Sequence, residues 1–400
     1  MKLRVITICV LFVSVLSACT NDAVKEVDNP LKGKLQATVE LKQTAVKKFV
    51  LDSSTSPKGI YIQVYNDKTG TQNFTFLNKY NKTIYFYNYQ TQKFIKKIEI
   101  DVSRFKSPPS PLAYFIKSAD SIYVFCKSME LLRIDSNGHT LESTSLIGNQ
   151  NFLKGNWVSQ YPQYHEQSAN PFMMTSTELL FPGQSIFSLA DDQINSFRFL
   201  THINFQTSKV SFSHNYPREL YGFGYDWNGQ IYTEPHTEIM PDGNTVIFSF
   251  PVSHNLYIGN LKNEAYTTVF GGSNEAGKIS SLKPGSHTDD EMISHIIKNY
   301  EYAAIRYDKY RKVFYRIMLK PAEASNNPGS HNFKDKPIAI IVFDENFKYL
   351  GETTIGKCLN FNILNTFVTQ QGLNIQYQAA DTDESAFNLR ILNIEKREKL

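Results

Sequence analysis

Two aromatic stretches contain the side chains best suited to hold a ligand. They are Trp157–His165 and Tyr221–Trp227, and together they include both tryptophans of the chain. Aromatic rings bury the apolar faces of sugars and peptides, while polar neighbours supply hydrogen bonds. We therefore predict a ligand site formed by six residues of these stretches: Trp157, Tyr161, Tyr164, Tyr225, Asp226 and Trp227. The alternative is that the rings pack between structural repeats as core residues.

Residues that could catalyse a reaction are dispersed along the chain. The sequence has no Gly-x-Ser-x-Gly, no His-Glu-x-x-His, no phosphate-binding glycine loop and no dinucleotide fingerprint. We assign no catalytic residue and expect no cofactor. A hydrolase or lyase stays open as an alternative, because a motif search does not find scattered carboxylates and histidines. Its first candidates are His165, Asp226, His236 and His254.

The best candidate for a metal site is Ser286–Tyr300 (SHTDDEMISHIIKNY). If this segment is helical from Thr288 to Lys298, Glu291 and His295 share one face at the spacing of metal ligands. Acids in a first turn also cap a solvated helix, beginning here with Ser286. We favour the capped helix and predict no metal site.

Three charged strings are interpreted as turns. Asp135–Gly138 and Asp381–Asp383 resemble calcium loops, but they lack the glycine at the sixth position and the glutamate at the twelfth. In Tyr307–Arg311 (YDKYR), Asp308 is expected to end a strand, and Arg311 to pair with it or with a neighbouring edge.

Short apolar runs separated by polar turns dominate the chain. In Leu112–Asp135, runs rich in Tyr, Phe, Ile and Val are broken by Asp, Ser and Asn without helical spacing, which predicts antiparallel strands. Units of three or four runs recur six times over roughly 40 to 65 residues each, and such repetition is typical of a β-propeller. We predict an all-β propeller with six blades, or seven if Lys48–Asn66 forms its own blade. The last unit has only three runs, so Leu35–Leu41 is predicted to close it.

Composition favours one large folded domain over residues 35–400. The chain of 400 residues is 41% hydrophobic and 20% charged, and no Pro/Gly/Ser-rich linker divides it. Its net charge of +4 is too small for a nucleic-acid surface, so no nucleic-acid partner is expected. Cys126 and Cys358 fall in or beside apolar runs and are predicted to be buried free thiols, with a disulfide between them as the alternative.

The N-terminus predicts export and lipid attachment. Two cations precede the apolar run Val5–Leu16, which is too short to span a bilayer, for which roughly 20 apolar residues are needed. The junction Leu-Ser-Ala-Cys19 resembles the lipobox of bacterial lipoproteins. We predict a signal peptide over residues 1–18, a lipid on Cys19 and a flexible tether over residues 19–34. The alternative is an ordinary secretory signal with an incidental cysteine.

Three segments carry a resemblance to a known family. They are the lipobox, Phe76–Ile100 (FLNKYNKTIYFYNYQTQKFIKKIEI) and Tyr302–Pro321 (YAAIRYDKYRKVFYRIMLKP). The chain resembles a family of uncharacterised bacterial lipoproteins, catalogued only as a domain of unknown function and similar in outline to TolB-like propellers. The resemblance implies a propeller and a cell-envelope address. It carries over no catalytic residue.

Three functions remain compatible with the sequence. We favour a non-catalytic binding or scaffold module, anchored to a bacterial membrane and recognising a glycan, peptide or protein. We favour the outer membrane as the site of the anchor, and the sequence does not decide between its periplasmic and its surface side. The alternatives are the hydrolase or lyase described above and a purely structural envelope component. The sequence leaves the oligomeric state open.

Overall fold

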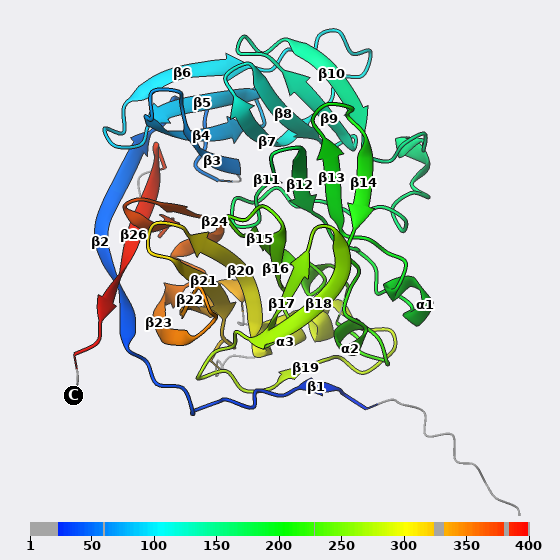
Figure 1. The fold of residues 1–400 in the computed structure, drawn as a ribbon, viewed down its shortest axis with the longest axis vertical. Coiled ribbons are helices and arrows are strands. Elements are labelled where there is room, and N and C mark those ends of the chain that lie inside the picture. Colours follow the sequence, from blue (N-terminus) through cyan, green and yellow to red (C-terminus); the bar gives the residue numbers. More distant parts are fainter. Residues whose placement is uncertain (1–22, 59–60, 228, 324–331, 380–383, 399–400) are drawn as a thin grey trace, which may run out of the picture.

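The structure is a computed structural model that describes residues 23–58, 61–227, 229–323, 332–379 and 384–398. The predicted signal peptide, Cys19 and the Asp381–Asp383 turn lie outside the described residues. Six four-stranded antiparallel sheets surround a common axis (Figure 1). The chain is therefore an all-β propeller with six blades, as predicted. Lys48–Asn66 does not form a seventh blade.

The strands of each blade follow one another in chain order, except in the last blade. Blades 1 and 2 comprise β3 (Tyr61–Asn66), β4 (Gln72–Asn78), β5 (Thr83–Asn88), β6 (Phe94–Glu99), β7 (Pro111–Ser118), β8 (Ser121–Cys126), β9 (Glu130–Ile134) and β10 (Thr140–Ser145). Blades 3 and 4 comprise β11 (Met173–Met174), β12 (Glu178–Pro182), β13 (Leu200–Asn204), β14 (Val210–Ser213), β15 (His236–Ile239), β16 (Thr245–Ser249), β17 (Asn255–Asn260) and β18 (Asn263–Phe270). Blade 5 comprises β20 (Glu301–Asp308), β21 (Val313–Leu319), β22 (Pro337–Asp344) and β23 (Tyr349–Lys357), and blade 6 comprises β24 (Phe361–Thr369), β25 (Gly372–Tyr377), β26 (Ala386–Lys396) and β2 (Val39–Val50).

The first strand of each blade lies nearest the axis. Contacts join β3 with β7, β15 with β20, β20 with β24 and β24 with β3 across blade boundaries (Figure 1). The second strands are covered on both faces, so β21 (VFYRIML) is buried throughout, whereas outer strands such as β6 (FIKKIE) are mostly exposed. Because the inner strands run in one direction, their two ends form two mouths of a central channel.

The N-terminal strand closes the ring. β2 pairs with β26 from Val39 opposite Lys396 to Val50 opposite Ala386, which confirms the predicted closure. The strand begins later and runs further than the predicted Leu35–Leu41. An outermost strand tolerates polar residues on its exposed face, and for this reason the polar stretch Lys42–Thr44 does not interrupt it.

The chain already contacts the propeller before β2. β1 (Glu26–Val27) pairs with β19 (Ile279–Ser280), and the Asn29 side-chain amide donates to the carbonyl oxygens of Ser273 and Ala276 at 2.8 and 2.9 Å. Figure 1 shows this segment along the outer edge of the ring. The predicted flexible tether is therefore wrong for residues 25–34, because backbone and side-chain partners in the connection between blades 4 and 5 hold this segment.

One long connection crosses the axis. It joins β10 to β11 and contains the segment Gln167–Phe172. The Ser168 hydroxyl accepts a hydrogen bond from the Ile62 amide of blade 1 at 2.8 Å, and the Ala169 amide donates to the Leu364 carbonyl of blade 6 at 2.9 Å. This connection covers one mouth of the channel.

Helices are short and few among the described residues. α3 (Asp289–Lys298) lies where a helix was expected, but its N-cap is Thr288, paired with Glu291 in a capping box, and not Ser286. The other helices are α1 (Asp191–Ile194), α2 (Arg218–Tyr221), η1 (Phe152–Lys154), η2 (Gly229–Ile231) and η3 (Phe333–Asp335). In the described part of the chain, none is long and apolar enough to cross a membrane.

Cys126 and Cys358 are both buried and unbonded to one another, as predicted. Burial raises the pKa of each thiol to about 12. Both side chains are therefore protonated, unreactive core groups at neutral pH.

Candidate functional site

The structure does not bring the two predicted aromatic stretches together. Trp157 and Trp227 are only 4% and 3% exposed, and they belong to separate hydrophobic clusters. Each indole N–H donates to a nearby backbone carbonyl, that of Phe152 at 2.9 Å and that of Leu220 at 2.6 Å. Both tryptophans are thus core residues whose N–H donors are satisfied. This agrees with the alternative interpretation, in which the rings pack as core residues.

The other predicted binding residues stay close to their own tryptophan. Tyr161 and Tyr164 pack in the cluster of Trp157, and the Tyr164 hydroxyl lies 2.5 Å from Thr201 Oγ1. Tyr225 stacks on Trp227 with ring centroids 5.2 Å apart, and Asp226 Oδ2 lies 3.2 Å from His287 Nε2. Ligand binding by the six residues stays a prediction, and the structure offers them no common mouth.

Two of the four predicted catalytic candidates lie near each other. His165 and His236 both interact with Glu234, whereas Asp226 pairs with His287. His254 is buried elsewhere, with Nδ1 2.7 Å from the Tyr302 hydroxyl. The histidines at positions 165 and 236 therefore mark one mouth of the channel, which we call the narrow mouth and define by Glu234 and the residues around it.

A large cavity opens at the opposite end of the channel. It has a volume of about 800 Å³ and lies where the inner strands of blades 1, 3, 4, 5 and 6 end. We call it the wide mouth. The inner strands contribute the following lining residues: Val64, Asn66, Met173, Met174, Glu238, Ile239, Arg306, Tyr307 and Val368.

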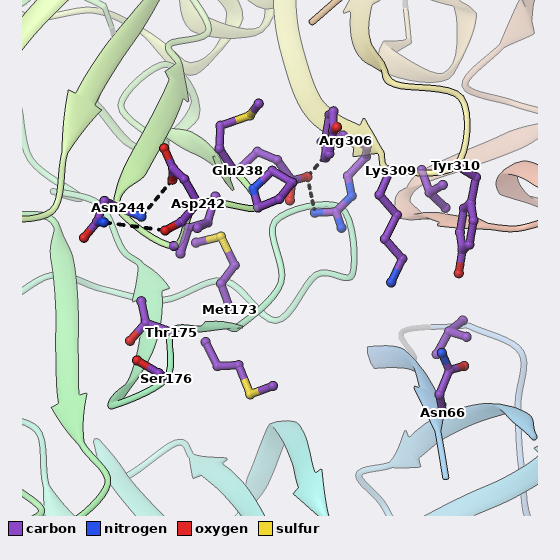
Figure 2. Close-up of a pocket in the computed structure, with 18 of the residues that line it drawn as sticks. Asn66, Met173, Thr175, Ser176, Glu238, Asp242, Asn244, Arg306, Lys309 and Tyr310 are labelled. Atoms are coloured by element: carbon purple, nitrogen blue, oxygen red, sulfur yellow. Dashed lines mark hydrogen bonds and ion pairs between the residues drawn. The ribbon is translucent and has the colours of Figure 1, made fainter. Parts of the chain in front are cut away.

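Two cations line the blade 5 side of the wide mouth (Figure 2). Arg306 Nη1 lies 3.2 Å from Glu238 Oε2, which also accepts a hydrogen bond from the Tyr307 amide at 3.0 Å. Burial raises the pKa of Glu238, although Arg306 partly offsets this effect. The Nε of Arg306 has no hydrogen-bond partner among the described residues. The carboxylate of Glu238 thus pairs with only some of the N–H groups of the Arg306 guanidinium.

The second cation of the wide mouth is Lys309. Figure 2 shows its amine directed into the space between blade 5 and Asn66 of blade 1. The amine lies 5.3 Å from the centroid of the Tyr310 ring, and no carboxylate of the described chain forms an ion pair with it. Lys309 is therefore available to an anion that enters the cavity.

Asp242, on the blade 4 side of the wide mouth, accepts hydrogen bonds within its own turn. Asp242 Oδ1 accepts hydrogen bonds from the amides of Asn244 and Thr245, each at 2.8 Å, and Oδ2 accepts from the Thr245 hydroxyl at 2.6 Å. Since these donors satisfy Asp242, it does not compete with a ligand for the two cations.

Methionines form the apolar part of the wide mouth. Met173 is 8% exposed and Met174 is 51% exposed, and Met240 joins them from the end of blade 4's inner strand. A thioether side chain is flexible and polarizable, so it adapts to ligands of different shape. The cavity therefore combines an adaptable apolar surface with two cations.

The sequence did not predict the wide mouth, but one turn that it did predict, Tyr307–Arg311, lies at its edge. The predicted pairing in Tyr307–Arg311 is confirmed, since Arg311 Nη1 lies 3.0 Å from Asp308 Oδ2. This pair fixes the turn, and the turn presents Tyr307, Lys309 and Tyr310 to the cavity. The signals in the sequence were a lysine between two tyrosines at a strand end and the adjacent pair Met173-Met174.

Among the described residues, the wide mouth contains no nucleophile paired with a histidine base. The Thr175 hydroxyl accepts hydrogen bonds from the Thr177 and Glu178 amides at 3.3 and 3.0 Å, and the described lining includes no histidine. Across the described residues, no group of three His, Cys, Asp or Glu side chains is placed to hold a metal ion. What the site supplies is shape, charge and apolar surface.

A family model for a domain of unknown function, DUF4221, matches residues 38–354. The chain belongs to this family. The resemblance inferred from the sequence is confirmed to this extent, and the match spans blades 1 to 4, most of blade 5 and the closing strand β2.

The fold of this DUF4221 protein is similar to that of a solved member of the family from Bacteroides vulgatus. The TM-score is 0.73 at 18% identity, and the match covers 90% of this chain and 100% of the other. A second similar structure is BamB from Moraxella catarrhalis, with a TM-score of 0.38, 11% identity and coverage of 88% and 100%. No curated protein matches the sequence.

Proposed function

We propose that this DUF4221 protein is a lipid-anchored, non-catalytic binding module of the bacterial envelope, and that its wide mouth binds a peptide segment with an acidic side chain. The observation that carries the proposal is the pair of cations, Arg306 and Lys309, that face a methionine-rich cavity with donor capacity to spare.

A peptide fits this cavity better than a glycan does. Its volume of about 800 Å³ falls within the usual range of ligand pockets, roughly 300 to 1,000 Å³. Flexible thioethers accommodate varied apolar side chains, as they do in promiscuous peptide-binding proteins. Sugar binding would instead favour broad exposed aromatic faces, and both tryptophans are buried in the core. An acidic side chain would pair with Lys309, in the positive field of the neighbouring Arg306 guanidinium.

The lipid anchor rests on the sequence of residues 1–19. Because residues 25–34 are held by the connection between blades 4 and 5, the chain between Cys19 and Lys25 is six peptide steps long, or about 20 Å when fully extended. A lipid on Cys19 would then hold the propeller close to the membrane surface, with the outer membrane preferred.

Peptide binding is tested with the soluble chain of residues 23–400. Fluorescently labelled octapeptides that contain two leucines and one glutamate are titrated beside peptides in which glutamine replaces the glutamate. We expect the acidic peptides to bind at least tenfold tighter. Lys309→Met should remove most of this preference, whereas Lys312→Met should keep it, because Lys312 is in the same turn but does not line the cavity. Equal binding of both peptides, or an unchanged preference in Lys309→Met, would refute the proposal.

The anchor is tested separately by fatty-acid labelling in bacterial cells. The full chain should incorporate the label and Cys19→Ala should not. Equal labelling of the two proteins would leave an ordinary secretory signal as the correct interpretation.

A hydrolase or lyase is the second candidate, because His165 and His236 flank one carboxylate at the narrow mouth. The chemistry there is unfavourable for catalysis. The Nε2 of His165 lies 2.9 Å from the Gln184 amide nitrogen, so its lone pair is already engaged. Cys358 lines a cavity of about 300 Å³ that Glu234 and His236 also line. Burial raises the pKa of its thiol to about 12, so it is not a thiolate nucleophile at neutral pH.

A further inference from the structure

We propose that the narrow mouth is a second ligand site, which binds a small organic cation consisting of a primary ammonium group on an apolar body. This inference does not rest on the proposed function of the wide mouth, because the two sites share no residue.

The narrow mouth contains two adjoining cavities of about 300 and 290 Å³. Both are lined by Gln167 and Glu234 and by Asn362 and Leu364 of β24. The first cavity extends between blades 5 and 6, where the inner strands β20 and β24 begin. Its volume suits a ligand of about ten non-hydrogen atoms, at the lower end of the range for small-molecule pockets.

Three buried polar atoms of the first cavity lack a hydrogen-bond partner among the described residues. They are Gln167 Oε1, His236 Nδ1 and Glu301 Oε2, and their residues are 3%, 4% and 8% exposed. An unsatisfied buried polar atom costs about 1 to 3 kcal/mol, and native proteins contain few of them. Three residues that line one cavity each contain such an atom, and this concentration points to a missing partner.

The contacts of Gln167 determine what kind of partner is missing. Its Nε2 donates to Glu234 Oε1, which also accepts from Asn170 Nδ2 at 3.0 Å. The reverse amide orientation would place an oxygen against this carboxylate, so the free atom of Gln167 is the acceptor Oε1. The missing partner is therefore a donor at this position.

Glu301 presents a second acceptor. The nearest cation is Lys336, whose Nζ lies 3.8 Å from Glu301 Oε2, too far for a hydrogen bond. This ammonium instead donates to the carbonyl oxygens of Ile296 and Asn299 at 2.6 and 2.9 Å. Since Lys336 is held by these carbonyls, the free oxygen of Glu301 remains open to a ligand.

His236 can provide the third acceptor. Burial lowers its pKa to about 4, so the imidazole is neutral near pH 7. With its proton on Nε2, the free Nδ1 accepts a hydrogen bond. A primary ammonium group has three N–H donors, which matches the three unpartnered acceptors in number.

Most of the remaining lining of the first cavity is apolar. Its walls include Ile231 from the connection between blades 3 and 4, and the following side chains of blades 5 and 6: Ala303, Leu319, Phe333, Phe361 and Ile363. The lining carboxylates Glu234 and Glu301 outnumber the one lining lysine, Lys334. An ammonium group would therefore meet the acceptors, while a hydrocarbon or aromatic body contacts the walls.

The inference is tested by calorimetric titration of the chain of residues 23–400 with three probes of the same shape. These are 2-phenylethylammonium, neutral 2-phenylethanol and anionic phenylacetate. We expect the ammonium to bind at least tenfold tighter than the alcohol and the carboxylate not to bind. Glu301→Gln should weaken ammonium binding at least tenfold, and Lys309→Met at the wide mouth should leave it unchanged.

A second variant addresses the case in which Glu301→Gln fails to fold. Leu364→Trp adds bulk at a position that lines both cavities and is 48% exposed, so it should block the ammonium without disturbing the core. Circular dichroism and thermal unfolding establish that each variant is folded. Equal affinities for ammonium and alcohol, unchanged binding in folded Glu301→Gln or Leu364→Trp, or no ammonium binding by the unsubstituted chain would overturn the inference.

Discussion

The two mouths of the channel lie at opposite ends of the same inner strands. They differ in the number of hydrogen-bond partners that surround their charged groups. At the narrow mouth, the long connection between β10 and β11 crosses the axis and surrounds Glu234 with His165, Gln167 and Asn170. At the wide mouth, tight turns end the strands, and Arg306 and Lys309 face an open cavity. The difference lies in how individual charges are satisfied: donors from the long connection satisfy Glu234, whereas Lys309 sits on a tight turn and faces the open cavity.

The largest expected difference between the mouths is in stability. Three donors and the nearby His236 lower the pKa of Glu234 to about 2 despite its burial, whereas burial raises the pKa of Glu238. Glu234→Gln should therefore lower the free energy of unfolding at pH 7 by about 3 kcal/mol, and Glu238→Gln by about 1 kcal/mol or less. Urea unfolding of both variants measures this difference. Equal losses would show that the wide-mouth pair is as important to the fold as the narrow-mouth network.

The pH dependence of stability should also separate the mouths. The pKa of His236 is lowered to about 4 by burial, so below pH 6.5 the unfolded chain binds a proton that the folded chain does not. This group's contribution is complete above pH 6.5 and is lost as the pH falls to about 4, by about 1.4 kcal/mol per pH unit. His236→Gln should reduce the slope of unfolding free energy against pH by that amount.

The matched control for this slope is Lys309→Met, since none of the described residues that line the wide mouth is a histidine. His214 and His254 have similarly lowered pKa values of about 4 and contribute to the slope that remains. A His236→Gln protein with the unsubstituted slope would mean that this imidazole is accessible to protons in the folded state.

The smallest effect is expected at the methionine surface of the wide mouth. Met174 is 51% exposed, so Met174→Ser should change the free energy of unfolding by no more than about 0.5 kcal/mol. The same change should weaken acidic-peptide binding several-fold, because the polar side chain loses the apolar contact. A loss of more than about 2 kcal/mol in stability would instead identify Met174 as a packing residue.

The fold could be predicted from the sequence because its signals are local. Strand runs and turns recur within each blade, and the missing fourth run of the last blade pointed to the N-terminal strand. The bounds of β2 were wrong because an outer strand accepts polar residues on its open face, and the docked segment around Glu26–Val27 is too short to show a strand pattern.

The sites could not be predicted in the same way. Trp157 and Trp227 looked suited to ligands, but each satisfies its N–H with a carbonyl only 5 or 7 residues away in sequence. The role of Glu234 could not be predicted because its partners, Gln167 and Asn170, lie more than 60 residues earlier in the chain. Such sites depend on which strand ends the ring geometry brings to one mouth, and no local pattern encodes that.

The closing strand has a consequence for the order of synthesis. Thr44 of β2 bonds to Ile391 of β26, which is 347 residues later in the chain. At roughly 5 to 20 residues per second, β2 would wait about 20 to 70 s for its partner to be made. Throughout this time its edge is exposed, and Lys42 and Lys48 place charges along it, a feature that discourages pairing with other strands. We therefore expect the lysine-rich sequence of β2 to limit pairing with other strands until the ring can close.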